Sequence, residues 1–180
     1  MFKRIIKYYA TRRLLLFFQS HKRIITINTL RNSKNVGVLW NPADEGSIEA
    51  YEKLSQSLNA KGIKPKGLAH VRSSRELEML TTISNSGFLH SRSVSLFGRP
   101  KLNSVMQFAH EPFDILIVLS VSKTLALQYI LVHSNSPFKV GWQGSELNYY
   151  DLNIDVSEKP QCHYLMEQII YYLENINEKG

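Results

Sequence analysis

Two apolar runs constrain the fold of this chain more than any other feature. Residues 35–40 (Asn-Val-Gly-Val-Leu-Trp) and 113–119 (Phe-Asp-Ile-Leu-Ile-Val-Leu) have the length and composition of strands. Neither run alternates apolar with polar residues, which is typical of a strand whose two faces are both buried. A sheet covered by helices on both faces would accommodate them, and this favours an α/β fold.

The rest of the chain alternates between strand and helix patterns. Ile48, Tyr51, Leu54 and Leu58 share one helical face after the first run. Further strands are predicted at residues 66–71, 94–97, 138–141 and 152–155, and further helices at residues 74–80, 102–109 and 123–132 and after residue 160. Ser120 and Ser122 are expected to cap the helix at residues 123–132. We therefore predict a Rossmann-like three-layer sandwich with a mainly parallel sheet over residues 35–180.

A basic arm, residues 1–34, precedes this domain. The first 35 residues hold nine lysines and arginines and no acidic residue, whereas the whole chain has a formal net charge of +7. The arm predicts a helix followed by a short β-branched strand at residues 24–27. One arc of that helix is apolar and holds Phe2, Ile5, Ile6, Tyr9, Ala10, Leu16 and Phe17.

Three interpretations of the arm stay open. Its apolar arc packs on its own domain or on a protein partner; or it lies in a membrane interface, with its basic residues at anionic headgroups. In the third, it binds structured RNA, with Tyr8, Tyr9 or Phe17 stacking on bases. The basic residues expected to face an anionic surface are Lys3, Arg4, Lys7, Arg12, Arg13, Lys22 and Arg23.

A ligand crevice is the alternative site. In open parallel sheets, ligands bind outside the carboxyl ends of the strands. The residues expected there are Asn41, Asp44, Ser120, Ser122, Lys123, Trp142 and Gln143. Ser122 and Lys123 at a helix N-terminus would suit an anion, although a helix cap beside a solvated lysine explains the same residues.

Several classes of site are excluded. The turn after the first strand has neither the dinucleotide fingerprint nor the P-loop motif. The six histidines are scattered without metal-ligand spacing, and the single cysteine, Cys162, lies on the apolar stripe of the last helix. We assign no catalytic residue, no cofactor and no metal. One cysteine and no apolar run long enough to span a bilayer favour the cytoplasm, although the arm's composition also fits a mitochondrial presequence.

Four segments carry a resemblance to known families: Phe97-Gly98-Arg99-Pro100, residues 113–117, residues 138–141 and Tyr150-Asp151-Leu152. They resemble a family of small, functionally uncharacterised proteins from Bacteroidota with a basic N-terminal helix and a Rossmann-like domain. Residues 114–117, 139–141 and 149–151 are also similar, more weakly, to the N-terminal half of heptosyltransferase-type glycosyltransferases. Those enzymes have two Rossmann-like halves and bind the sugar nucleotide mainly in the second, so this resemblance implies the fold without the chemistry.

These observations predict a non-catalytic interaction or accessory protein whose basic arm binds an anionic surface. The inner face of the cytoplasmic membrane is the first choice, and a ribosome or other RNA assembly is the second. The alternative is a protein, or an enzyme, that binds a nucleotide or sugar phosphate in the strand-end crevice. No reaction is assigned.

Overall fold

The computed structural model describes residues 2–142, 144 and 148–176, and its centre is one six-stranded sheet with strand order β3-β2-β1-β4-β5-β6. All paired strands run parallel. The strands are β1 (Asn35–Trp40), β2 (Lys64–Val71), β3 (Ser86–His90), β4 (Ile115–Leu119), β5 (Lys139–Gly141) and β6 (Leu152–Asn153). The strand order reverses between β1 and β4, as in Rossmann-like folds, so the predicted fold class is confirmed.

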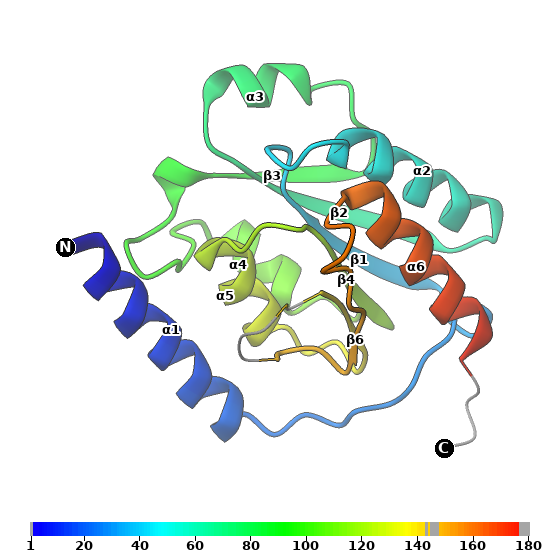
Figure 1. The fold of residues 1–180 in the computed structure, drawn as a ribbon, viewed down its shortest axis with the longest axis horizontal. Helices are drawn as coiled ribbons and strands as arrows, with labels where there is room; N and C mark the ends of the chain where they lie inside the picture. The colour runs from blue at the N-terminus through cyan, green and yellow to red at the C-terminus, as the bar shows by residue number, and fades with distance from the viewer. Residues whose placement is uncertain (1, 143, 145–147, 177–180) are drawn as a thin grey trace.

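Helices cover both faces of this sheet (Figure 1). They are α1 (Phe2–Ser20), α2 (Ser47–Ala60), α3 (Ser74–Met79), α4 (Asn103–Ala109), α5 (Leu125–His133) and α6 (Cys162–Asn175), with a short 3₁₀ turn at Ser91–Ser93. The α2 and α6 helices share one hydrophobic cluster with the sheet, and α1, α4 and α5 share the other. The three-layer arrangement follows directly from these two clusters.

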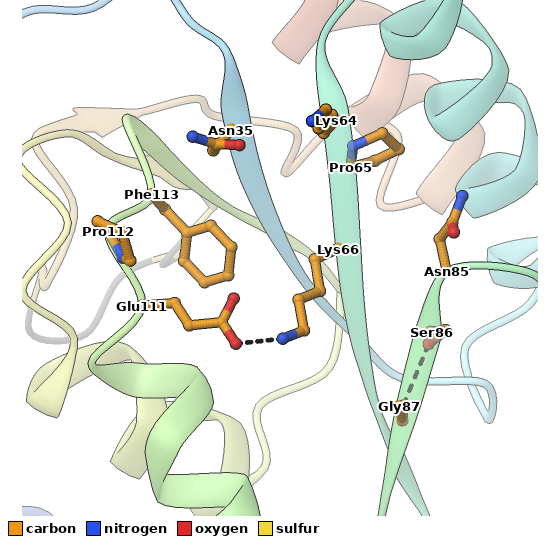
Figure 2. A pocket seen from close by; sticks show the side chains of 10 residues that line it. All are labelled: Asn35, Lys64, Pro65, Lys66, Asn85, Ser86, Gly87, Glu111, Pro112 and Phe113. Atoms are coloured by element: carbon orange, nitrogen blue, oxygen red, sulfur yellow. Dashed lines mark hydrogen bonds and ion pairs between the residues drawn. The ribbon is translucent and has the colours of Figure 1, made fainter.

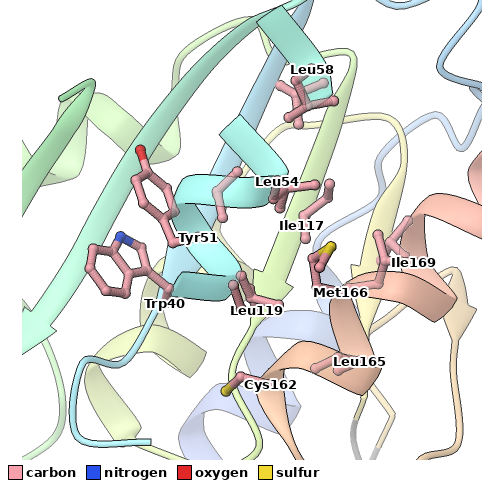
Figure 3. Close-up of a cluster of buried hydrophobic side chains, with 14 of the residues drawn as sticks. Trp40, Tyr51, Leu54, Leu58, Ile117, Leu119, Cys162, Leu165, Met166 and Ile169 are labelled. Carbon is pink, nitrogen blue, oxygen red and sulfur yellow. The ribbon is translucent and has the colours of Figure 1, made fainter. Parts of the chain in front are cut away.

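The central strand β4 shows why the runs are continuously apolar. Ile115, Ile117 and Leu119 enter the cluster under α2 and α6, whereas Leu116 and Val118 enter the cluster under α4 and α5. Figure 3 shows Ile117 and Leu119 among the side chains of α2 and α6. Each such buried aliphatic side chain stabilises the fold by about 1.5–3 kcal/mol.

Two predicted strands are wrong, and one strand was missed. Residues 94–97 form no strand, because Val94 makes only an isolated antiparallel bridge with Pro100. Residues 24–27 lie outside the sheet, and Thr26 N–H donates to the Pro137 carbonyl at 3.1 Å. The edge strand β3 was missed because only Leu89 of its five residues is fully buried, which leaves no apolar run to detect.

The arm packs on the domain through one face of α1. Ala10 and Leu14 are buried against α5, and the Phe17 ring stacks on His133 with centroids 4.0 Å apart. Leu14 lies outside the predicted apolar arc, whereas Ile5 and Leu16, which belong to that arc, are exposed. The apolar residues are therefore divided between a docked face and an outward face. Whether residues 35–180 fold without the arm stays a prediction.

Candidate functional site

At the reversal of strand order, a polar network joins the carboxyl ends of β1 and β4. Asp44 Oδ2 accepts hydrogen bonds from Ser120 Oγ (2.6 Å) and from the backbone N–H groups of Val121 (3.0 Å) and Ser122 (3.3 Å). Asn41 Nδ2 donates to Asp44 Oδ1 (3.1 Å) and to Ser122 Oγ (2.6 Å). The structure thus brings together four residues of the predicted crevice.

The turn after β1 presents Asp44 to this network. Asn41 Oδ1 accepts the Ala43 N–H at 3.2 Å, and Asp44 N–H donates to the Asn41 carbonyl at 3.0 Å. Gly46 then adopts a left-handed conformation (φ 69°) immediately before α2, which glycine allows without steric strain. This turn therefore aims the carboxylate at the loop after β4.

The position of a ligand anion is thereby taken by the chain's own carboxylate. Free N–H groups after a strand of a Rossmann-like sheet normally face a ligand, but here those of Val121 and Ser122 face Asp44. Beside the network, the described residues, including Lys123 and Trp142, line a cavity of about 20 Å³. That volume holds about one water molecule. Gln143 lies outside the described residues.

The helix cap differs from the prediction. Helix α5 begins at Leu125, and its N-cap is Thr124, whose Oγ1 accepts the Leu127 N–H at 3.3 Å. The side chains of Ser120 and Ser122 instead bond within the Asp44 network, so their assignment as helix caps is wrong. Thr124, two residues nearer to the helix than Ser122, is also a residue type that favours the N-cap position.

Cys162 lies at the edge of the Asp44 network. Its Sγ is 4.0 Å from Asp44 Oδ2, at the first residue of α6. Burial, and secondarily the negative charge of Asp44, raise the pKa of the thiol to about 12. The group is therefore protonated at neutral pH and is not a thiolate nucleophile.

A wide hollow lies at the opposite end of the sheet, at the amino ends of the strands. Its volume is about 640 Å³, and Figure 2 shows Lys66 and Glu111 facing each other within it as an ion pair. The Phe113 ring forms part of its wall, close against Gly37. The sequence did not predict this hollow. Ligands of open parallel sheets usually bind at the carboxyl ends of the strands, whereas this hollow lies at the amino ends.

A buried lysine was also missed. Lys139 is only 1% exposed, and its Nζ donates to the Leu131 carbonyl at 2.7 Å. Burial, and secondarily the positive charge of Arg23, lower its pKa to about 7, although Asp151 opposes this shift. The sequence did contain a signal for it, because Lys139 is the one polar residue of the predicted strand 138–141.

The basic residues of the arm fall into two groups. Arg4, Lys7, Arg12, Arg13 and Lys22 are exposed. Arg23, by contrast, pairs with Asp151 and donates to the carbonyls of Ser136 (3.1 Å) and Pro137 (3.0 Å), so it holds the arm on the domain. The position of the Lys3 side chain is outside the described part of the structure.

The outward face of α1 is unusually apolar for a surface helix. Ile5, Tyr8, Tyr9 and Leu16 are 47%, 60%, 55% and 56% exposed. After the helix, Ile24 and Ile25 are 85% and 60% exposed. Exposed apolar side chains that gather in one segment mark an interaction surface, whereas single ones are ordinary. We call these six residues, together with the exposed basic residues Arg4 and Arg12 among them and Lys7 and Lys22 at their margins, the outward face.

Within the described residues, no group of three or more histidine, cysteine or acidic residues is placed to hold a metal ion. In the same part of the chain, no helix has both the length and the apolar content that crossing a bilayer requires.

The chain belongs to DUF6913, a family of unknown function, whose sequence profile matches residues 4–176. This membership confirms the expected resemblance to an uncharacterised family over nearly the whole chain. No curated protein matches the chain.

Proposed function

We propose that this protein is a non-catalytic accessory protein that binds an anionic membrane surface through the outward face of α1 and the segment after it. The observation that carries the proposal is the exposure of four large apolar side chains on α1, on the side that does not pack against α5. Helix α1 then lies between the domain and the lipid, parallel to the membrane plane.

Charge on the outward face supports an anionic surface. The sequence has no acidic residue before Asp44, which is itself buried. In the described part of the chain, Arg4, Lys7, Arg12 and Lys22 form no ion pair with an acidic side chain. Each basic residue near an anionic membrane contributes about 1 kcal/mol of binding free energy, so these four contribute about 4 kcal/mol.

Aliphatic side chains favour lipid over RNA as the partner. Ile5, Leu16, Ile24 and Ile25 gain free energy in an acyl environment, but they neither pair with phosphates nor stack on bases. RNA stays the second candidate, because Tyr8 and Tyr9 are exposed side by side, with ring centroids 5.6 Å apart. The inner face of the cytoplasmic membrane is the surface that we propose.

The alternative function expected from the sequence, ligand binding in the strand-end crevice, has less support. The strand-end crevice has about 20 Å³ beside the Asp44 network in its described part, which gives little support to a nucleotide or sugar phosphate there. An origin in Bacteroidota and the partial likeness to heptosyltransferase-type glycosyltransferases stay predictions.

Sedimentation with lipid vesicles tests the proposal. The full chain should sediment with vesicles rich in phosphatidylserine, which have a strong negative surface potential. It should sediment much less with vesicles of pure phosphatidylcholine. Replacing Arg4, Lys7, Arg12 and Lys22 together by glutamine should abolish sedimentation in dilute buffer. The matched control replaces Lys53, Lys64, Arg72 and Arg75, two lysines and two arginines exposed elsewhere, and should sediment like the wild type.

Apolar substitutions give an independent readout. Ile5→Asn with Leu16→Asn should weaken sedimentation, whereas Met79→Asn with Leu102→Asn, at residues exposed on other helices and loops, should not. Equal loss in the two pairs would count against membrane insertion. Binding of a structured RNA by the wild type, without vesicle binding, would replace the membrane with RNA as the partner.

A further inference from the structure

A second cavity lies between α1, α5 and the loop of residues 95–99. Its volume is about 300 Å³, at the lower end of the range of ligand pockets. Two arginines, Arg13 of α1 and Arg99 of the loop, line it, and none of its described lining residues is acidic. Two positive charges without a counter-charge suit a dianion.

Aromatic rings supply most of the remaining wall. Phe17, Tyr129 and His133 form a continuous stack, in which His133 lies 4.0 Å from the ring centroid of each neighbour. Phe97 lies on the loop side, with the Arg13 guanidinium carbon 5.8 Å from its ring centroid. Such rings bind planar ligand groups by stacking, at low cost in side-chain entropy.

His133 contributes a hydrogen-bond acceptor to the wall of this cavity. Its Nδ1 lies 2.8 Å from the Tyr129 carbonyl, which only accepts, so Nδ1 carries the proton. Burial lowers the pKa of His133, and the ring is therefore neutral at pH 7 with Nε2 as an acceptor. The cavity's positive charge comes from the two arginines.

The loop that presents Phe97 and Arg99 is firmly built. Ser95 N–H donates to the Arg99 carbonyl at 2.8 Å, and Ser95 Oγ accepts the Arg99 N–H at 3.1 Å. Gly98 adopts φ 81°, and a side chain there would lie 2.7 Å from the Leu125 carbonyl oxygen. Glycine thus lets the loop pack directly on the start of α5. The loop needs little ordering when a ligand binds, which favours affinity.

We infer that this cavity binds a small ligand that joins a phosphate monoester to a planar ring, of the size of a nucleoside monophosphate. A phosphate monoester carries close to two negative charges at pH 7, whereas a carboxylate carries one. Guanidinium groups match its oxygens in bidentate geometry. Both faces of His133 are covered by Phe17 and Tyr129, so the ligand's ring stacks on Phe97 or on the outer face of Tyr129, and the volume excludes a dinucleotide. This site is separate from the Asp44 network and from the outward face.

Isothermal titration of the full chain without vesicles tests this inference, so its outcome does not depend on membrane binding. The titrants are AMP, GMP, CMP and UMP, the matching nucleosides and inorganic phosphate. We expect at least one nucleotide to bind with one-to-one stoichiometry and at least about tenfold more tightly than its nucleoside or phosphate alone. A nucleotide that binds no better than its nucleoside, or four nucleotides without measurable binding, would overturn the inference.

Matched variants locate the site. Arg99→Gln and Phe97→Ala should each weaken nucleotide binding by at least about tenfold. Their controls are Arg75→Gln and Leu96→Ala, both outside the cavity, and these should bind like the wild type. Arg99, Phe97, Arg75 and Leu96 are exposed, so each variant should keep the wild-type Tm within about 2 °C. Equal weakening in variants and controls would contradict this location.

Discussion

Arg23 and Asp151 form an ion pair across 128 residues of sequence, with side chains that are only 10% and 9% exposed. The same carboxylate accepts the Lys139 N–H at 2.8 Å at the start of β5. The ion pair therefore connects the segment after α1 to the edge of the sheet, and it holds in place the helix that carries the outward face.

Loss of this ion pair should be costly. Arg23→Gln leaves a largely buried carboxylate without its charged partner, and breaking a buried pair in this way costs about 3–5 kcal/mol of unfolding free energy. The control Arg31→Gln removes an exposed arginine of the same segment and should cost under about 0.5 kcal/mol. Urea unfolding measures both, and similar losses in the two variants would show that the pair does not anchor the arm.

Stability should rise with pH because of Lys139. Folding lowers its pKa from the ordinary 10.5 to about 7, so between these values the unfolded chain binds a proton that the folded chain releases. The unfolding free energy then increases with pH across this window, by at most about 1.4 kcal/mol per pH unit. Below pH 7 both states are protonated, and the charge is buried at full cost.

Lys139→Met removes this titration. Relative to the wild type, the variant should be most stable near pH 6, and its advantage should shrink steadily toward pH 9. The lost hydrogen bond to the Leu131 carbonyl lowers the variant's stability equally at every pH. The test is therefore how the stability difference between variant and wild type changes with pH, and not which of the two is more stable. The exposed control Lys53→Met should leave the slope unchanged. Parallel curves for wild type and Lys139→Met would show that Lys139 keeps an ordinary pKa.

Asp44 should contribute strongly to the stability of the fold. Asp44→Ala leaves the N–H groups of Val121 and Ser122 without their acceptor, and we expect a loss of about 3 kcal/mol in unfolding free energy. Asp155→Ala removes an exposed carboxylate that accepts the Ser157 N–H at 2.9 Å and should cost under about 1 kcal/mol. Thermal unfolding distinguishes them, and an Asp44→Ala protein as stable as Asp155→Ala would argue that the carboxylate is not a structural element.

The sequence predicts the middle of the sheet better than its edges. β1 and β4 have neighbours on both sides and helices on both faces, so their burial leaves an uninterrupted apolar signal. β3 pairs on one side with β2 and buries mainly Leu89, so its composition resembles a loop. Tertiary pairing, which local composition does not encode, decides whether such a segment is a strand.

The sequence predicts the sites, like the sheet, only in part. Asn41, Asp44, Ser120 and Ser122 were expected together, because the carboxyl ends of neighbouring parallel strands meet at one edge. That they bond one another depends on the path of two turns, which the residue types alone do not fix. The cavity that Arg13 and Arg99 line joins segments far apart in the sequence, so only the packing of α1 on α5 reveals it.

Similarly, the sequence identified α1 but not the face that docks. Apolar residues occur around much of the helix, and several patterns are compatible with them. Packing selects the small side chain of Ala10 and the adjacent Leu14 for the contact with α5, which leaves Tyr8 and Tyr9 outside. The division into docked and outward faces is therefore a tertiary property.

Quenching by brominated lipid tests the proposed membrane contact most directly. Tyr9→Trp places a reporter on the outward face, and Tyr171→Trp places one on α6, at a tyrosine that is similarly exposed (59% against 55%). The wild type supplies the background from Trp40 and Trp142. With phosphatidylserine vesicles that contain brominated acyl chains, fluorescence of the Tyr9→Trp protein should be quenched well beyond this background, and that of Tyr171→Trp should not. Equal quenching of the two reporters, or none at Tyr9→Trp, would contradict the membrane-binding account.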